Sequence, residues 1–295
     1  MPDEASPDSP ERPFAGLVMV STPIGNLGDV SPRARHVLQT AELVLCEDTR
    51  HTGRLLSAIG ADVKMAPLHE HNESVQIEPV LSRLRQGARI ALVSDAGMPL
   101  VSDPGYRLVR AAIAEGLPVT AIPGPNAALT ALVLSGLPPL PFLMLGFPPP
   151  RAAARRTAFG ALRAAERAGL TATLLFHESP HRLAEALADL ADLLGPRPAA
   201  VARELTKRFE EVVRATLPEL AARYAETPPR GEITLVVGPP PLEAAPAEAD
   251  LDALLRAALE GHSMKEAVAE VTAATGLPRR QVYARALGLA GSDRV

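Results

Sequence analysis

The residues best placed for chemistry lie in the segment 94–105, which reads SDAGMPLVSDPG. The apolar run 90–93 directly before it predicts a short buried strand. Small residues after a strand let the backbone approach a ligand closely, and parallel α/β sheets bind ligands beyond the carboxyl ends of their strands. The segment therefore indicates a small-molecule site. The alternative is a tight connection in which Asp103 caps the following helix.

Polar or glycine-containing segments also follow the other apolar runs of the N-terminal half. They are TPIGNLGD at 22–29, EDTRH at 47–51, HEHNE at 69–73 and PGPN at 123–126. Because parallel strands end at one edge of a sheet, we expect these segments to border a common site. The first of them lacks the spacing GxGxxG, which argues against a dinucleotide-binding fingerprint.

Alternating strands and helices must position these segments. In the first part of the chain we predict strands at 17–21, 43–47, 63–68, 90–93 and 118–122, and helices at 31–40, 52–59, 79–86, 106–115 and 127–135. This alternation is typical of an open α/β domain. The composition changes at LPPLP, so we place this domain at 14–137.

A second α/β domain is predicted at 138–238. Its expected strands are 142–146, 171–177, 199–203, 209–216 and 231–238, and its expected helices are 152–168, 179–195 and 218–225. Some of these strands follow one another without an intervening helix, which indicates a mixed sheet.

The ends of the chain differ from these two domains. Residues 1–13 are acidic, polar and rich in proline, which predicts a disordered tail. Residues 239–249 (PPPLEAAPAEA) are a linker by composition. Residues 250–295 form a predicted module of three short helices, two of which are joined by a Gly turn and resemble a helix-turn-helix. We expect this module to pack or to dock on RNA.

Composition narrows the class of protein. The chain has 295 residues, a formal net charge of −4 and one cysteine, Cys46, so it forms no internal disulfide. Its N-terminus lacks the basic and apolar regions of a signal peptide, and no apolar run approaches the ~20 residues of a membrane span. These features predict a cytoplasmic protein. The near-neutral charge excludes a globally basic nucleic-acid coat but leaves room for a local basic cleft.

Eight motifs taken together identify the family that the chain resembles. They are STPIGNLGD, CEDTRHTGRLL, HEHNE, ALVSDAGMPLVSDPG, IPGPNA, FHESPHR, RELTKRFEEV and GEITLVV. In this order and spacing they resemble the ribosomal RNA small subunit methyltransferase I family of the tetrapyrrole methylase superfamily. The resemblance covers residues 16–238, and the C-terminal helices look similar as well. One segment departs from the family pattern: PPPRAAARRTA, after Phe147, carries fewer lysines than we expect.

The resemblance implies a two-domain α/β homodimer that binds S-adenosyl-L-methionine in the cleft between its domains. It also implies methyl transfer to the ribose 2′-hydroxyl of a cytidine in 16S rRNA, within the small ribosomal subunit. The cofactor-binding residues that it implies are Pro23, Asp95, Ala96, Gly97, Ser102, Asn126, Ala127, Phe176, Ala202 and Glu232. For Pro23, Gly97 and Ala127, turn and helix geometry alone is the alternative explanation.

A ribose hydroxyl is a poor nucleophile, so we expect a general base or an orienting acceptor. Four carboxylates at or just past strand ends are candidates, and the sequence does not choose among them: Glu47, Asp48, Glu178 and Glu204. Helix caps and surface ion pairs are the alternatives for each. The candidate RNA contacts are Arg50, His51, Arg54, His69, His71, Arg155, Arg156, His181, Arg203 and Lys207. A solvated or ion-paired surface is the alternative for these residues.

The HEHNE motif also raises the question of a metal site. His69 and His71 share one face of an extended segment, and Glu73 could add a ligand. No third ligand stands at a defined spacing, and methyl transfer needs no Lewis acid, so we expect no metal. Contact with RNA and simple loop capping stay open for the two histidines.

Two other functions compete with rRNA methylation. A relative in the superfamily could methylate a tetrapyrrole or a protein side chain. A non-catalytic RNA-binding protein could use the three C-terminal helices as its reader, in which case S-adenosylmethionine would not bind.

Overall fold

The structure is a computed structural model that describes residues 14–101, 103–241, 248–275 and 277–292. The chain divides into two compact units, Met1–Pro240 and Pro241–Val295. Among the described residues, no helix has the length and apolar character needed to cross a membrane. The predicted tail, 1–13, and the greater part of the predicted linker, 242–247, lie outside the described residues.

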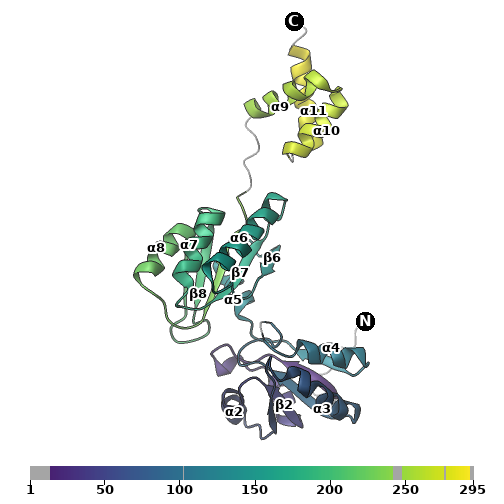
Figure 1. The fold of residues 1–295 in the computed structure, drawn as a ribbon, viewed down its shortest axis with the longest axis vertical. Coiled ribbons are helices and arrows are strands. Elements are labelled where there is room, and N and C mark those ends of the chain that lie inside the picture. Colours follow the sequence, from purple (N-terminus) through teal and green to yellow (C-terminus); the bar gives the residue numbers. More distant parts are fainter. Residues whose placement is uncertain (1–13, 102, 242–247, 276, 293–295) are drawn as a thin grey trace. The chain divides into compact units, whose positions relative to one another are not determined.

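The first unit contains two five-stranded sheets, and the first of them is entirely parallel (Figure 1). Its strand order is β3-β2-β4-β1-β5, formed by β1 (Gly16–Val20), β2 (Leu43–Cys46), β3 (Met65–Pro67), β4 (Arg89–Val93) and β5 (Val119–Ile122). Neighbouring β1 and β4 are in register from Gly16–Arg89 to Val20–Val93. Their carboxyl ends therefore coincide, and the loops that follow them start side by side.

Helices cover both faces of this sheet because successive side chains of a strand point to opposite sides. Val18 and Val20 of β1 pack on the side of α1 (Pro32–Thr40) and α2 (Thr49–Ala58). Leu17 and Met19 pack on the side of α3 (Glu73–Arg85) and α4 (Tyr106–Ala114). The continuous apolar strands of the sequence are thus buried on two sides.

The second sheet is mixed and has the order β6-β7-β10-β8-β9. Its strands are β6 (Phe142–Met144), β7 (Thr173–Glu178), β8 (Pro198–Arg203), β9 (Glu211–Thr216) and β10 (Ile233–Val237). Only β6 and β7 pair in parallel, while β10 runs antiparallel to β7 and β8. The prediction of an α/β protein with an open parallel sheet, a second mixed sheet and C-terminal helices is confirmed.

Helices also cover the two faces of the second sheet. One face packs against α6 (Ala152–Arg167), α7 (Leu183–Leu194) and α8 (Leu217–Glu226). The other face packs against α5 (Ala127–Ser135), which follows β5 in the chain. The backbone therefore passes from the first sheet to the second between β5 and α5.

Two helix starts differ from the predictions. We expected a helix to begin at Pro79, but α3 begins at Glu73 and contains Pro79 in its interior. We also expected Ser179-Pro180 to open a helix, but α7 begins at Leu183. Residues 179–182 instead form a turn in which Arg182 N donates to Ser179 O. In both cases proline was taken as an N-terminal signal, and tertiary contacts decided the actual start.

The second unit contains three helices within its described residues: α9 (Glu248–Gly261), α10 (Met264–Thr275) and α11 (Arg279–Ser292). They share a small apolar core that includes Leu255, Val268 and Val282. As predicted, Ser263 precedes the second helix, and its Oγ donates to Glu266 Oε2 at 2.6 Å.

Candidate functional site

The site begins where the loops after β1 and β4 are joined. Thr22 N donates to Gly97 O at 2.9 Å, and Gly97 N donates to Thr22 O at 3.1 Å. The Thr22 hydroxyl also donates to Ser94 O at 3.1 Å. These bonds hold the two predicted ligand loops against each other at the carboxyl edge of the parallel sheet.

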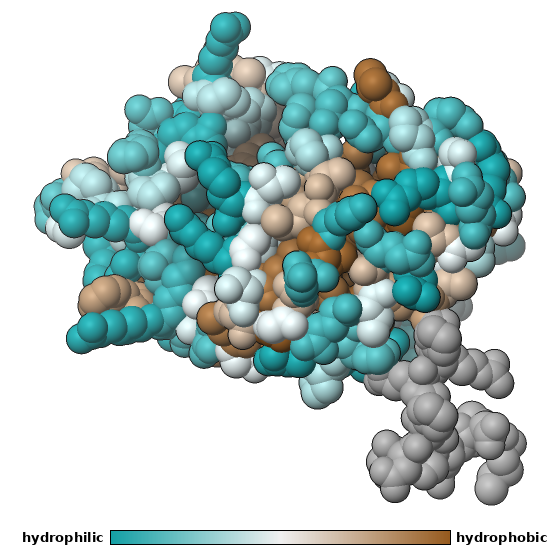
Figure 2. Space-filling model, turned by 90° about the horizontal axis from the view of Figure 1, so that it is seen from below, coloured by the Kyte–Doolittle hydropathy of each residue, from teal (hydrophilic) through white to brown (hydrophobic). Residues whose placement is uncertain are grey.

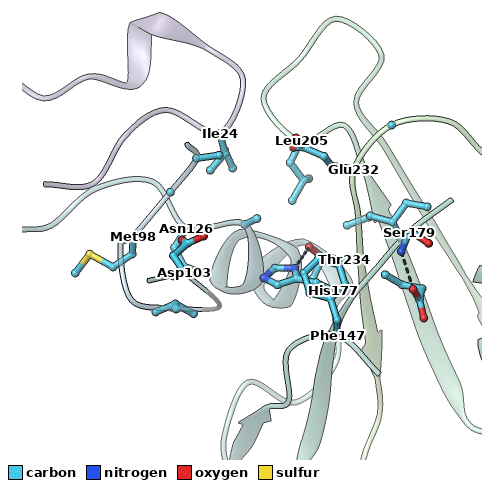
Figure 3. Close-up of a pocket in the computed structure, with 18 of the residues that line it drawn as sticks. Ile24, Met98, Asp103, Asn126, Phe147, His177, Ser179, Leu205, Glu232 and Thr234 are labelled. Atoms are coloured by element: carbon cyan, nitrogen blue, oxygen red, sulfur yellow. Dashed lines mark hydrogen bonds between the residues drawn. The ribbon is translucent and has the colours of Figure 1, made fainter. Parts of the chain in front are cut away.

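A cavity of about 410 Å³ opens beside these loops and reaches the second sheet (Figure 3). This volume lies within the range of small-molecule sites. The first sheet and its loops contribute Ile24, Ala96, Gly97, Met98, Val101, Asp103, Asn126 and Ala127. The second sheet and its loops contribute Phe147, His177, Glu178, Ser179, Pro180, Ala202, Leu205, Gly231, Glu232, Ile233 and Thr234.

Six of the ten predicted cofactor residues line this cavity: Ala96, Gly97, Asn126, Ala127, Ala202 and Glu232. Two others, Pro23 and Asp95, line a neighbouring cavity. Ser102 lies outside the described residues. The structure thus brings together eight of these residues around two adjoining cavities, and their contact with a cofactor stays a prediction.

Phe176, the remaining predicted cofactor residue, lines neither cavity, and its side chain points away from them. This side chain is 2% exposed and packs against Phe159 in the core on the other face of the sheet. Strand alternation is the reason, because neighbours on β7 point to opposite faces. His177, the next residue, therefore points into the cavity, with Asp103 and Asn126 on the facing wall (Figure 3). Alternation in the motif FHESPHR predicts that only one of these two neighbours faces the cavity, and the packing of the second sheet decides that it is His177.

The His177 ring is held in place from two sides. It lies 5.5 Å from the Phe147 ring, centroid to centroid, and its Nδ1 is 3.4 Å from the Thr234 hydroxyl. Burial lowers the pKa of His177 below its ordinary value, with Glu232 acting in the opposite sense. The imidazole is therefore neutral at pH 7 and can accept or donate a hydrogen bond in the cavity.

Glu178, a predicted catalytic residue, is a buried residue of the cavity lining, and strand alternation directs its side chain to the same face of the sheet as Phe176. It is 3% exposed, and its Oε1 accepts from Ser179 N and from Arg182, both at 2.7 Å. Its Oε2 is buried without a hydrogen-bond partner among the described residues. This oxygen is unpaired but closed to solvent, so a ligand reaches it only if neighbouring side chains move.

Asp103, which the sequence suggested as a possible helix cap, also lines the cavity. That alternative is wrong: α4 is capped by Glu73, whose Oε1 accepts from Arg107 N and Leu108 N at 2.7 and 3.1 Å. Burial raises the pKa of Asp103 to about 6, and the nearby carboxylates of Glu47 and Asp95 add to the effect. Asp103 therefore titrates close to neutral pH.

A second cavity of about 260 Å³ adjoins the first. The two share Ile24, Ala96 and Glu232. Three of the predicted RNA contacts line the second cavity: His51, Arg54 and Lys207. Its other lining residues are Thr22, Pro23, Gly25, Leu27, Leu55 and Asp95.

Lys207 is bound by two carboxylates at the edge of this second cavity. Its Nζ donates to Glu204 Oε1 at 2.9 Å and to Glu232 Oε2 at 3.0 Å. Burial alone would raise the pKa of Glu204, but the hydrogen bonds from Lys207 and from Glu232 N outweigh it and hold that pKa below its usual value. Glu204, a predicted catalytic residue, thus acts as an ion-pair partner in this structure.

The other two predicted catalytic carboxylates line neither cavity. Asp48 caps α2 and forms an ion pair with Arg50 at 3.1 Å, and the Arg50 hydrogen bonds lower the pKa of Asp48 to about 2. Glu47 is exposed and lies near Asp103. Arg50, a predicted RNA contact, is engaged by Asp48 although its side chain is largely exposed.

The prediction that Arg155 contacts RNA is wrong. Its side chain is 2% exposed, and its Nε donates to Asp189 at 2.7 Å. The neighbouring Arg156 is 43% exposed and pairs with Asp189 and Asp192. Acidic side chains of α7 thus neutralise the basic side of α6, a contact that the sequence does not reveal.

The remaining predicted RNA contacts line neither cavity. His71 and His181 are exposed, whereas His69 is half-buried and its Nδ1 has no hydrogen-bond partner among the described residues. Arg203 pairs with Glu211 across β8 and β9 at 3.2 Å. No group of three or more His, Cys, Asp or Glu side chains in the described parts of the chain could hold a metal ion.

Apolar side chains are exposed around the cavities. Leu27, Val101 and Phe147 are 55, 40 and 56% exposed and belong to loops that line them. Figure 2 shows a face of the molecule on which apolar side chains gather in a hollow bordered by hydrophilic ones. Exposed apolar surface next to a cavity is typical of a ligand or partner site.

Comparisons with known proteins agree over most of the chain. A family model of tetrapyrrole (corrin/porphyrin) methylases matches residues 16–221, and a model of the RsmI C-terminal HTH domain matches residues 245–290. A protein of Micromonospora olivasterospora named ribosomal RNA small subunit methyltransferase I is 47% identical over 273 residues, which cover 90% of this chain and 85% of the relative. A protein of Xylella fastidiosa with the same name is 45% identical, over 90% of this chain and 97% of the relative.

Solved structures show the same fold. The uroporphyrin-III C-methyltransferase of Thermus thermophilus, solved in complex with S-adenosylhomocysteine, matches with a TM-score of 0.53. The match covers 76% of this chain and 97% of that one, at 20% identity. At this identity the likeness concerns the fold alone.

Proposed function

This chain belongs to the ribosomal RNA small subunit methyltransferase I family, within the tetrapyrrole methylases, and from that premise we propose that it methylates 16S rRNA. The methyl donor is S-adenosyl-L-methionine, and the acceptor is the ribose 2′-hydroxyl of a cytidine in the small ribosomal subunit. The observation that carries the proposal is the 410 Å³ cavity, because six predicted cofactor contacts converge on it from both sheets.

The residues of the first cavity fit this donor. S-adenosylmethionine supplies a methyl group on a positively charged sulfur atom. Ile24, Ala127 and Leu205 offer apolar walls, and backbone groups of the Ala96-Gly97 segment are available at close approach. The acidic residues Asp103, Glu178 and Glu232 are among its lining residues, and no arginine or lysine of the described chain lines it. The cavity therefore favours a ligand that is apolar and carries positive charge.

Glu178 is the residue that we propose to accept, or to orient, the proton of the ribose hydroxyl. It is the one member of the four predicted carboxylates that lines the cavity, and its Oε2 is free of other described partners. By contrast, Asp48, with a pKa of about 2, is too weak a base for a task that works best near the operating pH. Arg182 and Ser179 N fix the orientation of Glu178 through its other oxygen.

We also infer that the protein is a cytoplasmic homodimer. Support for a dimer comes from α5, which is apolar on all sides. Ala128, Ala131 and Leu132 are buried against the second sheet, but Leu129 and Val133 are 46 and 77% exposed. A helix that is apolar all round is normally covered on all sides. Light scattering of the full chain, compared with the variant Val133→Lys, tests this inference.

The function is tested by tritium transfer from labelled S-adenosylmethionine to small ribosomal subunits that lack the modification, followed by nucleoside analysis. We expect the label in 2′-O-methylcytidine. Cofactor binding without transfer to rRNA would redirect the search to a tetrapyrrole or a protein side chain. If the protein shows no cofactor binding and no methyl transfer, the methyltransferase proposal is refuted and a non-catalytic RNA-binding protein is favoured.

A further inference from the structure

The second cavity is a separate compartment with a different set of charged side chains. No arginine or lysine of the described chain lines the first cavity, whereas Arg54 and Lys207 line the second together with Asp95 and Glu232. The two compartments share Ile24 and Glu232, which Figure 3 shows on opposite walls at the same end of the first cavity. A ligand in one compartment is therefore adjacent to a ligand in the other.

The acidic residues of the second cavity are already engaged. Asp95 Oδ1 accepts from Asp48 N at 3.3 Å, and Glu232 Oε2 accepts from Lys207. The side chains of His51 and Arg54, both exposed, have no hydrogen-bond or ion-pair partner among the described residues. Both side chains are therefore available to contact an anion that enters this cavity.

Lys207 is held rigidly at this place. Its aliphatic stem lies against Gly25, where an added Cβ would come within 2.3 Å of Lys207 Cγ. Its Nζ is fixed by Glu204 and Glu232, which leaves one of its three donors for another partner. The loop after β1 and the start of β10 thus meet at this side chain.

We propose that the second cavity receives the acceptor nucleotide of the RNA. Arg54 and His51 contact the phosphates that flank it, and the apolar side chains of Leu27 and Leu55 lie against its base or sugar. A cavity of about 260 Å³ takes a single nucleotide and not a duplex, so the nucleotide must leave its stack to enter. This inference rests on the proposed function and deepens it.

The charges separate this inference from its main rival, in which the second cavity holds part of the cofactor. A cationic sulfonium is repelled by Arg54 and attracted by the carboxylates of the first cavity, whereas a phosphate behaves in the opposite way. Pro23 and Asp95, predicted as cofactor contacts, line the second cavity and would then contact the nucleotide instead.

The test is the variant Arg54→Gln in the full chain. Two dissociation constants are measured: that of S-adenosylmethionine by calorimetry, and that of unmodified small ribosomal subunits by filter binding over a range of salt concentrations. We expect the subunit Kd to rise about tenfold and its salt slope to fall by about 0.7–0.9, the value for one phosphate contact, with the cofactor Kd unchanged. Arg54→Lys should keep the salt slope and lose only part of the affinity.

Arg167→Gln is the matched control. Arg167 is an exposed arginine at the end of α6, ahead of β7, whose opposite end lines the first cavity. An unchanged subunit Kd in Arg54→Gln would overturn the inference, and so would a weakened cofactor Kd alone. If wild-type protein transfers no methyl group to subunits, the proposed function fails first, and this outcome is distinguishable because it does not involve the variant.

Discussion

Gly231 and Glu204 are in such close contact that a Cβ atom on Gly231 would lie 2.3 Å from Glu204 Oε1. Gly231 has a φ of +87°, a conformation that side-chain-bearing residues rarely adopt. The same Glu204 oxygen accepts from Lys207 Nζ and from Glu232 N at 2.9 and 3.1 Å. The absence of a side chain at residue 231 thus permits the ion-pair network that joins the two cavities.

Replacing Gly231 by Ala should therefore disturb both stability and substrate binding. Backbone strain and the displaced carboxylate together should lower the free energy of unfolding by about 1–3 kcal/mol. Urea denaturation measures this change. Gly160→Ala is the control, because Gly160 lies inside α6 with open space around its Cα, and this variant should gain about 0.5–1 kcal/mol.

The titration of Asp103 should make cofactor binding depend on pH. With its pKa raised to about 6, Asp103 is ionised at pH 7 and mostly protonated at pH 5. If the ionised form attracts the sulfonium, affinity for S-adenosylmethionine should fall about tenfold from pH 7 to pH 5. Calorimetry at several pH values measures this, and Asp103→Asn should bind more weakly at pH 7 but with a flatter pH profile. An identical profile in the variant would assign the pH dependence to another group.

The raised pKa of Asp103 should also make the stability of the protein depend on pH, in a direction that follows from the shift. Its folded-state pKa of about 6 lies above the 3.8 of an unperturbed aspartate, so the folded protein binds the proton more tightly than the unfolded chain. The contribution of Asp103 to the free energy of unfolding therefore decreases as pH rises from about 4 to about 6 and is constant above that window. Thermal unfolding across this pH range gives the slope of the free energy of unfolding against pH for the wild type and for Asp103→Asn, and the two slopes are compared.

The buried ion pair between Arg155 and Asp189 should contribute to the stability of the fold and not to RNA binding. Arg155→Gln leaves a largely buried carboxylate with one partner fewer, and we expect a loss of about 3 kcal/mol in the free energy of unfolding. Arg156→Gln, at a 43% exposed side chain, should cost less than about 1 kcal/mol. A weaker affinity of folded Arg155→Gln for small subunits would contradict this assignment.

Glu178→Gln should slow methyl transfer by about 10²-fold or more, because the amide cannot take the hydroxyl proton. S-adenosylmethionine affinity should change far less than the rate. Glu178→Asp, which keeps a carboxylate, should recover more of the rate than Glu178→Gln, whereas a purely steric role would favour the isosteric amide. Glu226→Gln serves as the control, since Glu226 is exposed on α8 and lines neither of the two adjoining cavities.

Removing residues 241–295 should leave cofactor binding intact. All described lining residues of the first cavity lie before residue 240, and the C-terminal helices have their own apolar core. We expect the shortened protein to bind S-adenosylmethionine with wild-type affinity and to lose only part of its affinity for small subunits. Loss of all RNA affinity would identify the C-terminal helices as the sole RNA reader.

Some features of the protein could be predicted from the sequence because they depend on local patterns. Apolar runs such as 90–93 and 43–46 are too short for helices, and their alternation with helices indicated the open α/β sheet. Polar loops at the ends of these strands indicated where the site lies, since parallel strands end at one edge. Eight motifs in register indicated the family, which the relatives confirm.

Tertiary structure decided which side chains reach the site. Phe176 and His177 are neighbours in one motif, and only the packing of the second sheet shows which of its faces borders the cavity. Arg155 and Arg54 look alike as basic residues on predicted helices, but one meets Asp189 of a distant helix and the other faces a cavity. Burial and charge pairing are long-range properties, whereas composition and periodicity are local. For this reason the sequence by itself determined the fold and the family, and only the tertiary structure decided the members of the site.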